Sequence, residues 1–346
     1  MILILSNSED CHIVGVTEEL KRRGEEYRLF DPGPFPYSCR CVVDCSEGEP
    51  HARIDAEGTS LDLDRIRAVW LRRPGEFQLS ARLKAEELKW LRTECNHFFD
   101  AMWANLNAFW VSEPAQIRRA SLKLLQLRKA IELGLRVPRF VVTNDVSQAK
   151  SFIASCPGGV VVKVLALPTI FSPDRVATLY THLITKNDLS QIDSVSLGPT
   201  YLQEYVPKSM DIRVTVIGRS LFAVGIDAAG VESGRVDFRR AEVFELPHHP
   251  IKLPRRVEKA CLDLVEWLGL QFGAIDLLLT GEGEYVFLEI NPNGQWLWIE
   301  WMTGLPLTKA ICDLLIAGNR GETVKPRRQR NRSRRDEEIA PLPAAG

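Results

Sequence analysis

Two acidic residues and one asparagine stand in strongly apolar runs on either side of residue 281. Asp276 interrupts the run FGAIDLLL, and Glu289 and Asn291 follow in the run VFLEIN, which Pro292 ends. The segment GEGE between the runs predicts a β-hairpin with a loop of two or four residues, and either loop places Asp276 opposite Glu289. Opposed side chains have Cβ atoms about 5 Å apart, where two like charges destabilise a sheet. A cation with oxygen ligands, such as Mg²⁺, would remove this repulsion, and so would a neutral carboxyl group or a pairing arginine.

Alternation along the two predicted strands separates polar from apolar side chains. The apolar face is expected to hold Ile275, Leu277, Leu279, Val286, Leu288 and Ile290. The other face then presents three side chains with oxygen donors, which predicts a metal site formed by Asp276, Glu289 and Asn291.

Cationic side chains occur in other segments that have the pattern of buried strands. Lys163 lies in GVVVKVLA and Arg213 in MDIRVTVIG. The segment VDFRRAE, with Asp237, Arg239 and Arg240, adds a cationic cluster. A buried ammonium group needs an anion, which either a protein carboxylate or a bound phosphate would supply. Together with the carboxylates, these cations indicate a site for a polyphosphate that binds through its metal.

Composition limits the classes of protein that can carry such a site. The chain has 346 residues, 45% of them apolar, so it can form two or three packed units. No window approaches the roughly 20 apolar residues of a membrane span, and eight scattered cysteines favour a reducing compartment, so we expect a cytoplasmic protein. Without its basic C-terminal segment the chain has 37 basic and 41 acidic residues, which does not favour nucleic-acid binding.

The elements that must position these residues follow from periodicity. A β-α-β pattern opens the chain, and a strand over 65–74 and a long helix over 81–106 follow, which predicts a small α/β domain at 1–112. A helix over 121–133, a strand before residue 144 and a helix over 145–155 begin a second unit that extends to residue 320. Residues 321–346 read as a disordered basic tail by composition.

The order of the motifs VVVKV, QEYV, DIRVTVIG, GAIDLLL and FLEINPNG resembles the ATP-grasp superfamily over residues 113–320. Residues 1–112 are similar to the small α/β domain that precedes the grasp fold. The resemblance implies an α/β protein with a glutathione-synthetase-like ATP-grasp fold, whose α+β subdomains at 113–206 and 207–320 clasp ATP. It also implies site roles. ATP phosphates would meet Lys123, Lys163 and Arg213, adenine would meet the hinge strand at Glu204, Tyr205 and Val206, and two Mg²⁺ ions would bind Asp276, Glu289 and Asn291.

A departure from the superfamily pattern indicates a narrower group. The segment KVLALPTIFSPDRVATLYTHLIT contains no glycine, although many ATP-grasp enzymes have a glycine-rich loop there. With AVWLRRPGEF, VDFRR, YTHLIT and NPNGQWLWIEW, the chain resembles the graspetide synthetases, which are microviridin-type macrocyclases of ribosomal peptides. The resemblance implies that ATP phosphorylates an acidic side chain of a precursor peptide with a leader, and that a Thr, Ser or Lys side chain displaces phosphate to give an ester or amide. Arg213, Arg239 and Asp237 are the expected catalytic residues, and a homodimer is implied.

Two other classes of function stay open at this point. A ligase of the glutathione synthetase kind would join a free amino acid to a small substrate or a protein tail. An ATP-binding module that has lost its chemistry would have no need of all three metal donors and the lysine strand. The tryptophans of QWLWIEW would either wall a substrate channel or fill a core.

Overall fold

The N-terminal part of the chain is built on a parallel sheet with the strand order β2-β1-β6-β7. The computed structural model describes residues 1–45, 48, 50–56, 58–166, 169–172 and 175–322. The apolar run of β1 is buried along its whole length, as is typical of a parallel strand with both faces covered. The elements of this part are β1 (Ile2–Leu5), α1 (His12–Arg22), β2 (Tyr27–Phe30), β6 (Ala68–Leu71), α2 (Ala85–Ala104) and β7 (Phe109–Val111).

A second, antiparallel sheet in this part was not predicted. It consists of β3 (Cys39–Asp44), β4 (His51–Ala56) and β5 (Thr59–Asp62). These strands bury few side chains, so their sequences lack a sustained apolar face. Ile54 is the residue by which β4 joins the core beneath α2.

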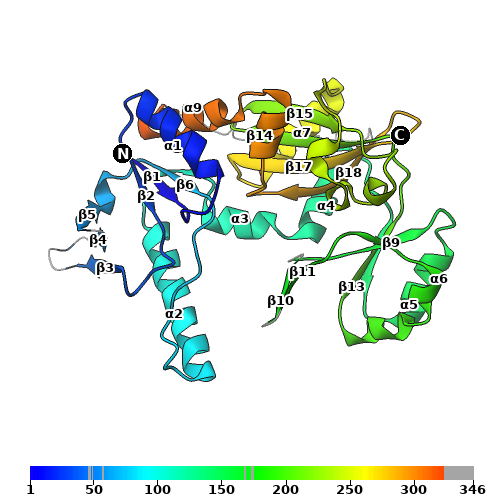
Figure 1. Cartoon of the computed structure of the whole chain (residues 1–346), viewed down its shortest axis with the longest axis horizontal. Helices are drawn as coiled ribbons and strands as arrows, with labels where there is room; N and C mark the ends of the chain where they lie inside the picture. The colour runs from blue at the N-terminus through cyan, green and yellow to red at the C-terminus, as the bar shows by residue number, and fades with distance from the viewer. Residues whose placement is uncertain (46–47, 49, 57, 167–168, 173–174, 323–346) are drawn as a thin grey trace, which may run out of the picture.

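The middle of the chain forms a smaller lobe, which projects from the rest of the molecule in Figure 1. Its antiparallel sheet has the order β12-β9-β13-β8. The predicted strand around Lys163 is present, and it ends at Lys163 itself. The elements are β8 (Phe140–Thr143), α5 (Val146–Ala154), β9 (Val160–Lys163), the hairpin β10 (Thr169–Ser172) and β11 (Arg175–Thr178), β12 (His182–Leu183), α6 (Lys186–Leu189) and β13 (Thr200–Glu204).

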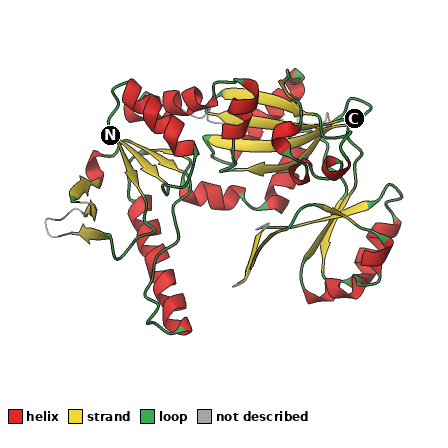
Figure 2. Ribbon diagram, viewed as in Figure 1, coloured by secondary structure: helices red, strands yellow, loops and turns green. Residues whose placement is uncertain are grey.

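A five-stranded antiparallel sheet, ordered β16-β15-β14-β17-β18, carries the C-terminal part (Figure 2). The single helix predicted over 121–133 is preceded by a second short helix, α3. The strands are β14 (Met210–Ile217), β15 (Ser220–Ile226), β16 (His248–Pro250), β17 (Phe272–Leu279) and β18 (Tyr285–Asn291). The helices are α3 (Pro114–Ala120), α4 (Lys123–Glu132), α7 (Arg255–Trp267), α8 (Leu297–Thr303) and α9 (Leu307–Asn319). The predicted tail lies outside the described residues from 323 onwards.

The predicted pairing of Asp276 with Glu289 is confirmed, although the predicted loop is wrong. The hairpin loop has five residues, Thr280 to Glu284, because Leu279 pairs with Tyr285. A bulge at Leu288 adds one residue to β18 and restores the predicted register at Glu289.

Because of this bulge, the predicted composition of the apolar face is partly wrong. Val286 and Leu288 do not join Ile290 but pack with Leu278 and Val206 in a small cluster on the other side of the sheet. Phe287 is fully buried on the core side with Ile290, under α4 and α7. The face that carries Asp276 and Glu289 is therefore partly apolar towards Val206. The strand predicted to hold Glu204, Tyr205 and Val206 ends at Glu204, so Tyr205 and Val206 follow β13.

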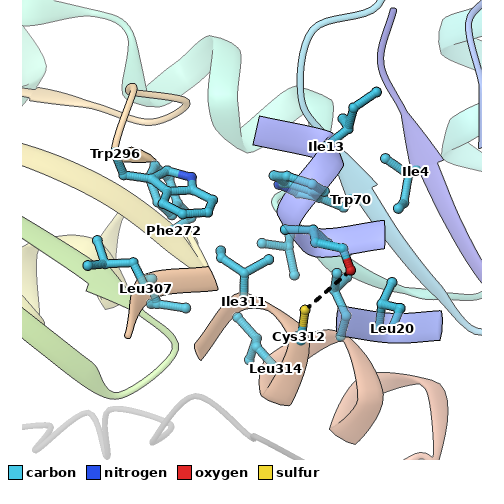
Figure 3. Close-up of a cluster of buried hydrophobic side chains, with 14 of the residues drawn as sticks. Ile4, Ile13, Leu20, Trp70, Phe272, Trp296, Leu307, Ile311, Cys312 and Leu314 are labelled. Atoms are coloured by element: carbon cyan, nitrogen blue, oxygen red, sulfur yellow. Dashed lines mark hydrogen bonds between the residues drawn. The ribbon is translucent and has the colours of Figure 1, made fainter. Parts of the chain in front are cut away.

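An apolar core joins the two ends of the chain. Helix α9 lies beside α1 in Figure 1, and its side chains fill the space between the N-terminal sheet and β17. Figure 3 shows Trp70 of β6 and Trp296 of the segment after β18 in this core, together with Ile311 and Cys312 of α9. The N-terminal sheet and the C-terminal sheet are thus packed through one shared core.

Candidate active site

Three charged side chains form a row across neighbouring strands of the C-terminal sheet. Arg213 of β14 pairs with Asp276 of β17, which pairs with Glu289 of β18. The guanidinium Nη1 of Arg213 donates to Oδ1 of Asp276 at 2.7 Å, and Nδ2 of Asn291 donates to the other oxygen at 3.1 Å. Two carboxylates and an amide thus meet on one face, as predicted. Asp276 is paired with an arginine, one of the alternatives to a metal that the sequence left open.

Glu289 lies among lysines. Its Oε2 is 2.7 Å from Nζ of Lys123, and both side chains are mostly buried, with 14% and 15% exposed. Burial acts to raise the pKa of Glu289, but the charges of Lys163 and Lys123 outweigh it and hold this pKa below its ordinary value. Burial lowers the pKa of Lys163 against the attraction of Glu289, and burial raises the pKa of Asp276 against the attraction of Arg213. The site is therefore a tight cluster of opposite charges, in which the three cations Arg213, Lys123 and Lys163 outnumber the two carboxylates.

Gln126 explains why Lys123 reaches Glu289. It lies one turn after Lys123 on α4 and is buried. Its side-chain amide donates to the carbonyl of Ile290 at 2.9 Å, and its side-chain carbonyl accepts from the amide of Ile290 at 3.1 Å. These two bonds hold α4 against the edge strand β18 next to Glu289. Sequence reasoning missed Gln126, since nothing marks a glutamine within a helix as buried.

All the residues predicted for the site line one of three adjoining cavities. The central cavity, of about 190 Å³, is lined by Lys123, Lys163, Asp237, Arg239, Asp276, Glu289 and Asn291. The hinge cavity, of about 40 Å³, is lined by Lys163, Glu204, Tyr205 and Val206. The outer cavity, of about 630 Å³, is lined by Arg213, Arg239, Asp276 and Asn291. Shared lining residues make the three cavities one continuous run, from the hinge strand past the carboxylates to the outside.

Apolar side chains line one part of the small hinge cavity. Val206 and Leu278 are buried beside it, and Leu288 lines it from β18. The amide of Tyr205 donates to the carbonyl of Gly159 at 3.0 Å, so that amide serves the protein fold. The apolar surface contributed by the bulged strand suits a flat ring.

Arg239 lies where the central and outer cavities meet. Its Nε and Nη2 donate to the two oxygens of Asp237 at 2.8 and 2.6 Å, and Oδ2 of Asp237 also accepts from the amide of Thr181 at 3.1 Å. Burial acts to raise the pKa of Asp237, but Arg239 outweighs it and lowers this pKa. This two-bond pairing fixes the plane of the guanidinium group, which suits it to orient a second carboxylate or a phosphate.

Two charged residues of the site were missed. Lys208 and Asp211 form a buried ion pair at 2.6 Å, with Lys208 lining the hinge cavity and Asp211 the central one. Burial raises the pKa of Asp211 to about 6. The signal was present, because Asp211 stands two residues before Arg213 in a buried strand and must share its face. Arg73 of the N-terminal part, which lines the outer cavity, was also missed.

The tryptophans divide between the two roles considered for them. Trp296 is buried in the shared core and Trp298 lines the outer cavity, while Trp301 is 63% exposed. Trp70 and Trp110 are buried core residues.

Known proteins share this architecture. Residues 1–118 match the family model described as the MvdD pre-ATP grasp domain. A search of curated proteins finds no match. Among solved structures, the macrocyclase MdnC of Microcystis aeruginosa MRC, bound with precursor peptide MdnA, is 28% identical, with a TM-score of 0.81 over 91% of this chain and 99% of that one.

Two further structures add nucleotide complexes. A RiPP-associated ATP-grasp ligase of Chryseobacterium gregarium, in complex with ADP and a leader and core peptide, is 26% identical, with a TM-score of 0.85 over 91% of this chain and 96% of that one. The ATP-grasp ligase PsnB, complexed with a phosphomimetic variant of minimal precursor, Mg and ADP, is 25% identical, with a TM-score of 0.73 over 92% and 98%. These similarities confirm the predicted fold and the predicted resemblance.

Proposed function

We propose that this chain, an ATP-grasp ligase of the graspetide type, activates acidic side chains of a ribosomal precursor peptide with ATP and closes ester or amide cross-links within that peptide. The observation that carries the proposal is the row Arg213, Asp276 and Glu289, with Lys123 and Lys163 beside it, between a small apolar cavity and a large outer one. We place the base of ATP at the hinge strand and its phosphates at the cations of the central cavity. The outer cavity then receives the peptide.

The residues of the row fit magnesium by their chemistry. Asp276, Glu289 and Asn291 offer oxygen donors, which Mg²⁺ prefers, and the cations that compensate them can turn to phosphate oxygens instead. Magnesium bound there would neutralise charge on the ATP phosphates. Arg213 and Lys123 can each serve two partners, a carboxylate or a phosphate, because each contacts a carboxylate whose charge a bound metal would otherwise neutralise.

The proposed reaction gives the carboxylate of the peptide a leaving group before the cross-link forms. A carboxylate oxygen of the peptide attacks the γ-phosphorus of ATP, ADP leaves, and an acyl phosphate forms. A hydroxyl or amine of the same peptide attacks the acyl carbon, loses its proton and expels phosphate. Lys123, Lys163 and Arg213 offset the negative charge of the phosphoryl group during its transfer. Arg239, held by Asp237, orients the acceptor carboxylate.

The alternative, a ligase that adds a free amino acid, has less support. The solved structures most similar to this chain include complexes with precursor peptides, leader and core peptide among them. The large outer cavity, lined by Phe238, Phe244 and Trp298 as well as arginines, suits a peptide better than a single small amino acid.

The test begins with a search of the neighbouring reading frames for a short peptide with repeated Thr and Glu or Asp, followed by incubation of that peptide with the protein, ATP and Mg²⁺. We expect the peptide to lose the mass of one water for each bond formed, with one ADP released per bond. Gain of an amino-acid mass would support the alternative ligase. The variant Asp276→Asn is the control, since it should fold yet release no ADP; undiminished turnover in this variant would contradict the assignment of Asp276.

We further place this reaction in the cytoplasm, where ATP and ribosomal peptides meet and where the eight free cysteines stay reduced. Within the described residues, no helix is both long and apolar enough to span a bilayer. We propose a homodimer that binds no nucleic acid. Candidate surfaces for the leader are α2 and the segment 208–240.

A further inference from the structure

A cluster of three buried charged or polar side chains lies outside the proposed site. Asp10 and His12 stand at the start of α1, and Arg72 follows β6; their side chains are 1 to 3% exposed. Nδ1 of His12 is 2.7 Å from Oδ1 of Asp10, and Nε of Arg72 is 3.2 Å from the other oxygen of Asp10. Burying such groups is costly, so a specific use for them is expected.

Arg72 grips the segment that follows β18. Its Nη1 donates to the main-chain carbonyl of Asn293 at 2.6 Å and to the side-chain carbonyl at 3.2 Å. In return, Nδ2 of Asn293 donates to the carbonyl of Arg72. The two residues are thus joined in both directions, although 221 positions separate them in the chain.

His12 holds the other end of the same segment. Its Nε2 accepts from the amides of Trp296 at 3.3 Å and Leu297 at 3.4 Å, at the start of α8. Burial lowers the pKa of His12 and so favours the neutral ring that such an acceptor requires. Asp10, Cys11 and His12 gather closely enough to suggest a metal site, but both ring nitrogens of His12 are already bonded.

The segment between these two anchors leads directly into the carboxylate row. It begins at Asn291, a proposed metal ligand, and the carbonyl of Gln295 accepts from Nη2 of Arg213 at 3.0 Å. Gly294 presses on β17 so closely that an added Cβ would lie 2.6 Å from Cβ of Ala274. A shift of this segment would therefore move Asn291, and would also move Arg213 away from Asp276.

The N-terminal and C-terminal parts of the chain are also packed together independently of Asp10, His12 and Arg72. The shared core, with Trp70 and Trp296 in contact range of α9, already joins them through apolar surface (Figure 3). Apolar packing has little directional preference. Hydrogen bonds with both carbonyls of Asn293, the carbonyl of Arg72 and the amides of Trp296 and Leu297 instead fix the position of the segment after β18.

We infer that Asp10, His12 and Arg72 are positioning residues for the metal-binding end of β18, so that the N-terminal part of the chain sets the affinity of the site for Mg²⁺. The inference rests on the proposed function, because it takes Asn291 and Asp276 as ligands. Partners that orient metal ligands typically change metal affinity about 10- to 100-fold when removed.

The experiment compares Mg²⁺ titrations of the full chain with the non-hydrolysable analogue AMPPNP at fixed concentration. Asn293→Ala removes the two side-chain bonds of the grip and leaves every buried charge in place, whereas Arg72→Lys removes the guanidinium group that also bonds to the main-chain carbonyl of Asn293. We expect each variant to raise the Mg²⁺ midpoint about 10- to 100-fold, with unchanged affinity for AMPPNP in the absence of metal. Arg67→Lys is the control, since Arg67 precedes β6 at its other end and its guanidinium group donates to the carbonyls of Asp64 and Ile66. The Mg²⁺ midpoint of this variant should stay at the wild-type value.

Three results would overturn the inference. An unchanged Mg²⁺ midpoint in both Asn293→Ala and Arg72→Lys would show that the grip does not position the ligands. Equal loss of metal-free and metal-bound nucleotide affinity in both variants would show a general structural role instead. A wild-type chain that binds no nucleotide with or without Mg²⁺ would refute the proposed function itself, and this inference with it.

Discussion

Replacing Glu289 by glutamine leaves two buried lysines without their anion. The Oε2 to Nζ distance of 2.7 Å to Lys123 corresponds to about 6 kcal/mol of attraction at an effective dielectric constant of 20. Desolvation of both groups offsets part of this, and removing one partner of a buried pair typically costs about 3–5 kcal/mol. We therefore expect Glu289→Gln to lower the free energy of unfolding of the nucleotide-free protein by about 3–5 kcal/mol.

The measurement is urea unfolding followed by tryptophan fluorescence, and the chain offers a matched control. Glu284 ends the loop of the same hairpin and pairs with Arg136, and both side chains are about half exposed. An exposed pair contributes about 0–1 kcal/mol, so Glu284→Gln should be nearly neutral. Equal effects of the two substitutions would refute the electrostatic account of the site.

A double variant separates the ion pair from other effects of Glu289. Lys123→Met alone should also destabilise, because it leaves Glu289 with Lys163 as its remaining close cation. Combined with Glu289→Gln, the loss should fall short of the sum of the single losses by about 1–3 kcal/mol. Simple additivity would mean that Lys123 and Glu289 do not interact in solution.

Two further predictions concern the loop after β18 and the missed carboxyl group. Gly294→Ala should reduce ADP release at saturating ATP by tenfold or more, because the added Cβ meets Ala274 and displaces the segment. The far-UV circular dichroism of this variant should match that of the wild type. Full activity would show that the segment has room to move. Asp211 has a folded pKa of about 6 against an ordinary 3.8, so the folded state binds this proton more tightly than the unfolded state does. Loss of this proton therefore lowers the free energy of unfolding as pH rises from 4 to 6, by about 3 kcal/mol in all. Asp211→Asn should flatten this part of the plot of urea midpoint against pH. An unchanged plot would contradict the raised pKa of Asp211.

The sequence predicted the local chemistry of the site well because strand alternation constrains it strongly. Asp276, Glu289 and Asn291 could be placed on one face from period-two alternation, and the pairing followed from symmetry about the GEGE segment. The prediction survived a wrong loop only because the bulge at Leu288 compensates for it. A bulge depends on packing against neighbouring elements, which one strand's sequence does not encode.

Contacts between distant segments were beyond sequence reasoning. Nothing in the order of residues indicates that Lys123 would reach Glu289, or that Arg72 would bond to Asn293. Polar residues directly after the buried strands β1 and β6 were a usable hint, since such ends often carry function. Which distant partners they meet depends on how the sheets pack.

The packing of α9 on the N-terminal sheet also bears on how the protein is made. The terminal amine of Met1 donates to Oδ1 of Asn319 at 2.9 Å, and Arg320 pairs with Glu25, so both ends of the described chain meet in one place. One face of the N-terminal sheet is thus covered by α9, which lies near the far end of the described residues. The last strand of that sheet ends at Val111 and α9 ends at Asn319, so about 200 further residues must be synthesised before this apolar face is covered, and the folding of the sheet is completed late.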